Sequence, residues 1–221
     1  MESIFIVKFT SIARTGVMIY SNITQSIIIF PVRMELNLGM TAVYAVLLRG
    51  INVGGHNKIK MAELRKVLEE AGCEQVQTYI QSGNIVLKSK LDPFMLREQL
   101  EEIIQTAFGL SVPVVVRSSE AFDAIMQQSP FEESALREGE SIHVSMLAGT
   151  PSEEGLARLA AAERGNDEYR IIGSDVHLLF RQSIRDSKLA VNLAKLGVQG
   201  TVRNWNTMKK LHAMLKEYIM D

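Results

Sequence analysis

Cysteine, aromatic residues and net charge are all scarce in this chain. The single cysteine, Cys73, cannot form an internal disulfide, so a reducing compartment, and hence a cytoplasmic location, is expected. Lys and Arg number 24 against 25 Asp and Glu, so no whole-molecule field attracts nucleic acid or anionic lipid. No apolar run reaches the about 18 residues that span a bilayer, and we expect no membrane association. Any anion binding must therefore come from a local patch.

The first 39 residues differ in composition from the rest. Two short β-prone runs, at 4–7 and 27–30, are joined by Ser, Thr and Asn without a helical pattern. Glu2 stands where a signal peptide carries positive charge, and no continuous apolar region leads to a cleavage site. We predict an N-terminal extension that is either disordered or the product of a mis-assigned start codon, with the functional chain beginning near Met40. The alternative is an added hairpin on a sheet edge.

From residue 40 onward, hydrophobic periodicity predicts two successive β-α-β-β-α-β units. The first is expected to have strands at 44–49, 76–80, 85–89 and 112–117 and helices at 61–71 and 93–108. The second is expected to have strands at 142–147, 169–172, 176–180 and 201–203 and helices at 153–163 and 187–196. One helix at 120–128 connects the units, and another at 206–218 follows them.

This order of elements predicts an α+β fold of two tandem ferredoxin-like (βαββαβ) repeats with an extra C-terminal helix. The repeats share little sequence, so the inferred duplication depends on element order alone. We place the first repeat at 40–118, a connecting helix and loop at 119–140, and the second repeat with the C-terminal helix at 141–221.

A glycine-rich loop follows the first predicted strand, where residues 49–58 read RGINVGGHNK. Glycine permits positive φ and close backbone approach, while Arg, Asn and Lys supply donors, so the loop can present N–H groups to an anionic or polar partner. It is not a P-loop, because no Lys-Ser/Thr pair follows Gly55, and it lacks the G-x-G-x-x-G spacing of dinucleotide sites. A purely structural tight turn is the alternative.

Topology suggests which polar segments meet. Right-handed crossovers place the glycine-rich loop and the turn at 81–84 at one end of the first sheet. In the second repeat, the helix start at 187–188 and the strand exit at 203–206 also share one end. If these ends approach each other, the four segments line one cleft. The predicted ligand-binding residues are Arg49, Gly50, Asn52, Gly54, Gly55, Asn57, Lys58, Gln81, Ser82, Asn84, Ser187, Lys188, Arg203, Asn204, Trp205 and Asn206.

Several of these residues also have a structural interpretation. Arg49, at the end of an apolar strand, suits a carboxylate or phosphate ligand but equally an internal ion pair. Turn chemistry alone explains Asn84, and Ser187 is more typical of a helix N-cap than of a nucleophile. Lys188 opposes the helix dipole, so helix stability does not explain it. Trp205 is more typical of a core or inter-repeat position than of a ligand platform.

Other chemistries find little support. The four histidines show no metal-ligand spacing and Cys73 has no partner nearby in the sequence, so we expect neither a metal nor a cofactor. The polar motifs contain no Asp or Glu to act as a base, which argues against hydrolase chemistry. An RNA-recognition sheet carries stacking aromatics on its central strands, whereas the strands at 44–49 and 85–89 contain only Tyr44.

Five motifs occur in a fixed order, at 47–55 (LLRGINVGG), 60–64 (KMAEL), 79–84 (YIQSGN), 187–189 (SKL) and 203–207 (RNWNT). Together they resemble the bacterial domain-of-unknown-function family 1697, and the resemblance extends over residues 40–221. It implies a two-repeat α+β fold and a bacterial cytosolic protein. The family has no established activity to carry over, so the resemblance assigns no reaction.

The function that we predict is binding of an anionic or phosphate-bearing ligand, a nucleotide or nucleic acid, in a cleft between the repeats of a monomer or weak homodimer. Two alternatives stay open. One is a protein-interaction or assembly module with no small ligand. The other is a transferase-type enzyme that uses positive charge and positioned hydrogen bonds.

Overall fold

The computed structural model describes residues 18–21, 27–30 and 41–220. The chain divides into two compact units, Met1–Leu38 and Gly39–Asp221. In the first, strands β1 (Met18–Ser21) and β2 (Ile27–Phe30) pair antiparallel as a two-stranded sheet. Strand β2 coincides with the β-prone run predicted at 27–30. The run at 4–7 and the predicted start near Met40 lie outside the described residues.

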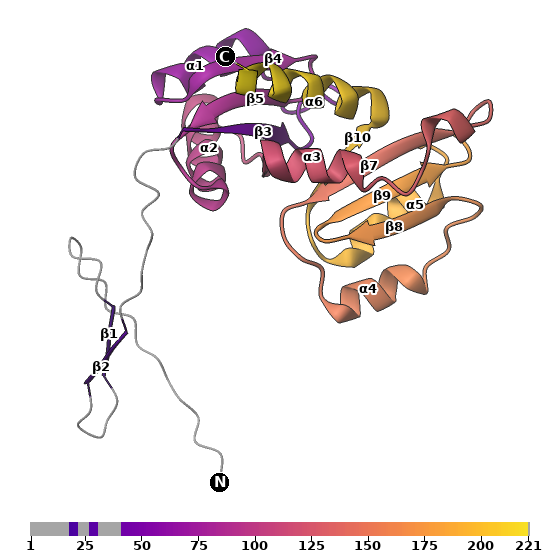
Figure 1. Ribbon diagram of the computed structural model, residues 1–221. Coiled ribbons are helices and arrows are strands. Elements are labelled where there is room, and N and C mark those ends of the chain that lie inside the picture. The colour runs from indigo at the N-terminus through magenta and orange to yellow at the C-terminus, as the bar shows by residue number, and fades with distance from the viewer. Residues whose placement is uncertain (1–17, 22–26, 31–40, 221) are drawn as a thin grey trace. The chain divides into compact units, whose positions relative to one another are not determined.

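The second unit begins with a four-stranded antiparallel sheet in the order β4-β5-β3-β6. Its strands are β3 (Ala42–Leu48), β4 (Glu74–Tyr79), β5 (Asn84–Ser89) and β6 (Val114–Ser118). Helices α1 (Met61–Glu70) and α2 (Pro93–Phe108) cover one face (Figure 1). Apolar positions at helical spacing produce this packing, because Leu64 and Leu68 of α1 and Leu96 of α2 join the same buried cluster.

The second sheet has the order β10-β7-β9-β8. Its strands are β7 (Ser141–Leu147), β8 (Glu168–Ile172), β9 (Asp175–Phe180) and β10 (Gly200–Asn204). The accompanying helices are α4 (Glu153–Ala160), α5 (Lys188–Asn192) and the short 3₁₀ turns η1 (Glu133–Ala135) and η2 (Leu193–Leu196). Val176, Leu178 and Phe180 of β9 pack with Leu159 and Leu189 of these helices.

The remaining helices, α3 (Ser119–Gln127) and α6 (Trp205–Met220), lie between the sheets. Alternate residues of β3, such as Val43 and Leu47, point away from α1 and α2. They form one buried cluster with Val144 of β7, Phe122 of α3 and Leu211 of α6. Figure 1 shows α6, in yellow, running along the first sheet from the end of β10. A shared apolar core thus joins the two sheets.

The α+β class is confirmed, with two four-stranded antiparallel sheets and six α-helices among the described residues. Most predicted helices agree with the observed bounds to within two residues, and two depart from the prediction for reasons that the structure shows. The helix predicted at 187–196 tightens into η2 for its last turn, just before Gly197 at φ 71° ends it. The helix predicted at 153–163 ends at Ala160, because the Ala162 N–H closes a tight turn onto the Leu159 carbonyl. None of the helices in the described residues combines the length and hydropathy of a bilayer-spanning segment.

Candidate functional site

The glycine-rich loop between β3 and α1 folds as an exposed tight turn. Val53 and His56 form an isolated β-bridge, in which the His56 N–H donates to the Val53 carbonyl at 3.0 Å. Gly54 and Gly55 form the tip with φ of 59° and 82°, the left-handed pair that a type I′ turn requires. Within residues 41–220, no hydrogen bond engages the backbone amides of these two glycines. The tip therefore presents both N–H groups to solvent.

Asn52 fixes the base of this loop and connects it to the β4–β5 turn. Its Nδ2 donates to the Ile59 carbonyl at 2.9 Å and to the Gln81 carbonyl at 2.8 Å, while its Oδ1 accepts the Ile59 N–H at 2.9 Å. The Leu48 N–H also donates to the Gly83 carbonyl at 2.8 Å. The loop and the turn therefore meet at one end of the sheet, as the topology predicts. We call residues 49–60 and 80–83 together the rim.

The rim carries three exposed cationic side chains, Arg49, Lys58 and Lys60, of which Lys60 pairs with Glu63 at 2.9 Å. Neither Arg49 nor Lys58 forms an ion pair within residues 41–220, so the internal pair considered for Arg49 is not formed there. Asn57 steadies the loop beside them, donating through Nδ2 to the Gly50 carbonyl at 3.2 Å. The rim therefore combines two positive charges that no ion pair neutralises within residues 41–220 with two exposed backbone amides.

Backbone strain occurs in the same place. Ile80, the residue before Gln81, has φ 49° and a side chain that is 51% exposed. The left-handed conformation costs an L-residue roughly 1–2 kcal/mol, and it is rare for a β-branched side chain. Burial of the Ile80 side chain does not compensate this cost. Such strain is concentrated at binding and catalytic sites, so it supports a functional assignment of the rim.

Arg203 of β10 lies beneath the β4–β5 turn and is only 8% exposed. Its Nε donates to the Asn84 Oδ1 at 2.5 Å, and its Nη2 donates to the Leu48 and Ser82 carbonyls, each at 2.9 Å. Its Nη1 donates to the Thr201 Oγ1 at 2.5 Å. Burial lowers the pKa of Arg203 to about 10, so the guanidinium stays charged at neutral pH. Carbonyl and amide dipoles surround this charge, and the guanidinium links the second sheet to the first.

The other residues predicted near Arg203 lie at the start of α6. The Asn204 Oδ1 accepts the Thr207 N–H at 2.8 Å and so caps this helix. Trp205 is half-buried against the core between the sheets, in agreement with its structural interpretation. Asn206 is exposed.

Ser187 and Lys188 have partners within the second sheet and its helices. The Ser187 Oγ accepts the Ala190 N–H at 3.0 Å, which makes it the N-cap of α5, and donates to the Asp167 Oδ2 at 2.6 Å. Lys188 pairs with Glu163. The structure thus joins three of the four predicted segments through direct hydrogen bonds, and the fourth has partners of its own.

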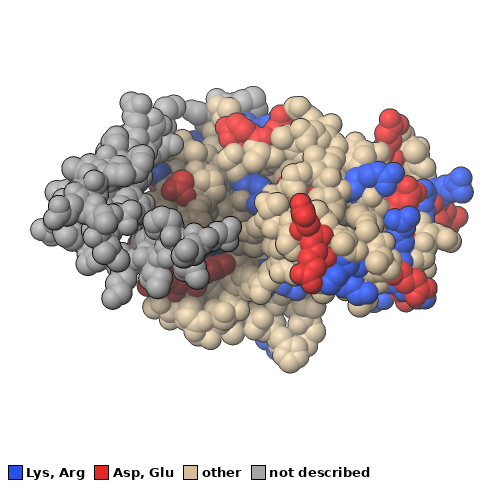
Figure 2. All heavy atoms as spheres, turned by 90° about the horizontal axis from the view of Figure 1, so that it is seen from below, with Lys and Arg blue, Asp and Glu red and all other residues tan. Residues whose placement is uncertain are grey.

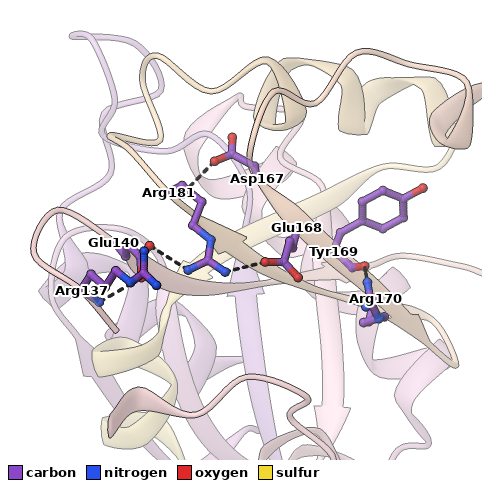
Figure 3. A network of polar contacts seen from close by, with 7 residues as sticks. All are labelled: Arg137, Glu140, Asp167, Glu168, Tyr169, Arg170 and Arg181. Carbon is purple, nitrogen blue, oxygen red and sulfur yellow. Dashed lines mark hydrogen bonds and ion pairs between the residues drawn. The ribbon is translucent and has the colours of Figure 1, made fainter. Parts of the chain in front are cut away.

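Asp167 belongs to a network drawn in Figure 3. Its Oδ1 accepts the Arg181 N–H at 2.8 Å, and the Arg181 guanidinium bridges Glu140 at 2.7 Å and Glu168 at 2.5 Å. The Glu140 Oε2 accepts the Arg137 N–H at 2.9 Å, and this contact and the guanidinium lower the pKa of the Glu140 carboxyl. Through these hydrogen bonds, Arg181 at the end of β9 connects the segment before β7, which contains Glu140, with the start of β8 at Glu168.

Sequence reasoning missed several residues that the structure singles out. Nothing in the pattern indicates the strained φ of Ile80 or the role of Thr201 as an acceptor for Arg203. It also missed an ion pair between Arg117 of β6 and Asp175 of β9, at 2.9 Å. Arg117 is the last residue of the otherwise apolar strand predicted at 112–117, and Arg49 is likewise the last residue of the apolar strand predicted at 44–49. Among the described residues, no group of three or more His, Cys, Asp or Glu could hold a metal ion.

The chain is similar to one protein family and to a solved structure. A family model described as Protein of unknown function (DUF1697) matches residues 40–177. The solved structure of the conserved bacterial protein SP0830 from Streptococcus pneumoniae has a TM-score of 0.67 and 27% sequence identity, and the match covers 80% of this chain and 99% of that one. Comparison with curated proteins gave no match.

Proposed function

Since the chain belongs to the DUF1697 family of proteins of unknown function, we propose a function from its own site: binding of a phosphate-bearing ligand at the rim. One observation carries the proposal. Exposed Arg49 and Lys58 lie in the same loop as the Gly54 and Gly55 amides, which have no hydrogen-bond partner within residues 41–220. Guanidinium groups and consecutive backbone N–H groups are the donors with which proteins recognise phosphate oxygens.

The predicted residues divide into two roles in this proposal. Arg49, Lys58 and Gln81 are exposed and contact the ligand together with the two glycine amides. Two of the other predicted residues, Asn52 and Arg203, hold the rim in place. Asn52 ties the loop to the turn, and Arg203 ties the turn to the second sheet. A rim fixed in this way loses little conformational entropy when a ligand binds.

Two exposed apolar side chains refine the ligand class. Val53 is 65% exposed and Ile80 51% exposed, and they adjoin Asn52 and Gln81, which are hydrogen-bonded to each other. They favour a ligand that carries an apolar surface beside its phosphate, such as a nucleotide or a short nucleic acid strand. On the face drawn in Figure 2, Lys and Arg alternate with Asp and Glu, without a continuous basic stripe. A long duplex draws its affinity from many cationic contacts, whereas the rim offers only Arg49 and Lys58 as cations without an ion pair within residues 41–220, so a mononucleotide or short strand is favoured.

We also infer that each four-stranded sheet with its helices is one ferredoxin-like repeat. Counted within each repeat, both sheets have the strand order fourth, first, third, second. This identity of order supports a duplication, with repeats at 40–118 and 141–221, a connector at 119–140, and residues 1–39 as an extension. The ligand would then bind at the end of the first repeat that faces the β10 strand of the second.

A ligand panel tests the proposed function. Calorimetric titration of the full chain with ATP, tripolyphosphate and a single-stranded RNA hexamer should detect binding of ATP or the RNA. Arg49→Ala should weaken that binding about tenfold, the equivalent of roughly 1.4 kcal/mol, because a charge-assisted hydrogen bond is lost. Its thermal midpoint without ligand should stay unchanged, since the Arg49 side chain is exposed.

The matched control is Arg185→Ala, which removes the same charge from an exposed position near the start of α5. It should bind like the parent chain. Equal affinity of the two variants would contradict the role of Arg49. Absence of binding across the panel would favour an interaction module, for which the exposed Val53 and Ile80 would be contact residues.

A further inference from the structure

A concave region lies between the sheets, away from the rim. It is a cavity of about 430 Å³ that is open to solvent and is lined by residues of α3, the end of β6 and the turn that joins β8 to β9. Its walls are mainly apolar, with Val116, Ile125 and Ile172 among them. Its size is that of small-molecule sites, which occupy about 300–1,000 Å³.

His177 of β9 supplies the unusual feature of this cavity. Its side chain lines the cavity and is 1% exposed. Neither Nδ1 nor Nε2 has a hydrogen-bond partner among the described residues. On the neighbouring strand β7, the residue opposite is the apolar Val144. Buried polar atoms are almost always satisfied, so two unsatisfied ring nitrogens at a cavity wall point to a partner that the cavity admits.

The two charged residues that line the cavity, Arg117 and Asp175, pair with each other. The Arg117 guanidinium donates from Nη2 to the Asp175 Oδ1 at 2.9 Å, to the Leu147 carbonyl at 2.7 Å and to the Ser174 Oγ at 3.3 Å. Arg117 and Asp175 therefore neutralise each other. Burial lowers the pKa of His177, so its imidazole is neutral at pH 7, with one N–H donor and one acceptor. A charged ligand would lose its hydration here without gaining an unpaired counter-charge.

We propose that this cavity binds a small, uncharged and largely apolar molecule that hydrogen-bonds to His177 through an amide or hydroxyl group. The apolar walls supply most of the contact area. The neutral imidazole offers one N–H donor and one acceptor nitrogen that point in different directions, so an amide or hydroxyl group of the ligand can pair with the nitrogen that it reaches from the cavity. The proposal does not depend on phosphate binding at the rim.

Three single-ring probes of similar size and different charge test the proposal: benzamide, benzoate and benzylammonium. Saturation-transfer NMR with the full chain at pH 7.5 should show benzamide binding in the millimolar range. In protein-observed NMR spectra, benzamide should also shift the His177 ring resonances. The two charged probes should bind about tenfold more weakly or not at all, because their desolvation is uncompensated. Tighter binding of either charged probe, or no binding of benzamide, would overturn the proposal.

Variants assign the site. His177→Phe keeps the ring volume but removes both nitrogens, and it should weaken benzamide binding about tenfold or more. His143→Phe is the matched control, since His143 lies on β7 with its ring against Phe180 and does not line the cavity. Ala124→Leu on α3 narrows the cavity without altering His177 and should also abolish binding. This variant decides the outcome if His177→Phe does not fold. Benzamide binding that persists in Ala124→Leu refutes the proposed site.

Discussion

Replacing Arg203 with methionine should destabilise the protein strongly, because Arg203 joins the two sheets. Methionine fills a similar volume but donates no hydrogen bond. The Asn84 Oδ1 and the Leu48 and Ser82 carbonyls would each lose a donor that comes from the other sheet. An unsatisfied buried acceptor costs about 1–3 kcal/mol, so these three represent roughly 3–9 kcal/mol.

The net loss is smaller, since the variant no longer buries a charge, and replacing a buried ion by an apolar group recovers part of its desolvation cost. We expect a decrease of about 4 kcal/mol in the free energy of unfolding, against a total of roughly 5–15 kcal/mol for a natural domain. At about 2–4 °C per kcal/mol, the thermal midpoint should fall by roughly 8–16 °C.

Urea unfolding at 25 °C, followed by fluorescence of the single tryptophan and by far-UV circular dichroism, measures this change. Trp205 is a suitable probe because it lies against the core between the sheets. The matched control, Arg185→Met at an exposed position, should stay within about 0.5 kcal/mol of the parent chain. A loss below about 1 kcal/mol in Arg203→Met would refute the role of Arg203 in joining the sheets.

Two further predictions follow from the structure. Gly83→Ala should lower the free energy of unfolding in urea by about 2 kcal/mol or more, because the new Cβ would lie 2.7 Å from the Leu48 Cβ and Gly83 has φ 74°. Gly55→Ala, at φ 82° with no atom within 4 Å, should lower it by only about 1 kcal/mol. Equal losses in the two variants would contradict the steric argument. His177 has a pKa lowered from 6.5 by burial, so below that pH the unfolded chain binds more protons than the folded chain and stability falls as pH falls. His177→Phe should reduce this slope, by at most about 1.4 kcal/mol per pH unit, when unfolding is compared from pH 8 to pH 5; identical profiles would show that His177 is not buried in the neutral form.

Local patterns in the sequence determine most of the element order. Apolar residues at helical spacing identify α1 and α2, and Pro93 and Gly109 mark the two ends of α2. Chain topology also places the glycine-rich loop beside the β4–β5 turn, a contact that Asn52 and Gln81 make directly. These features were predictable because each depends on neighbouring residues or on the fixed handedness of crossovers.

Contacts between the two four-stranded sheets were less accessible to sequence reasoning. Arg203 and Asn84 stand in separate motifs 119 positions apart, and only their packing shows that they hydrogen-bond to each other. The cavity at His177 depends on which face of β9 meets α3, and both faces of this strand are buried, so a single buried face does not mark the choice. The strain at Ile80 likewise results from the turn geometry, since isoleucine carries no preference for positive φ.

Amide NMR on the ¹⁵N-labelled full chain tests phosphate binding at the rim most directly. On titration with ATP, the largest shift changes should fall on the Gly54 and Gly55 amides, together with the Arg49 side-chain Nε–H. These changes should disappear in Arg49→Ala and persist in Arg185→Ala. Unchanged glycine amides at saturating ATP, or shift changes confined to residues outside the rim, would contradict phosphate binding at the rim.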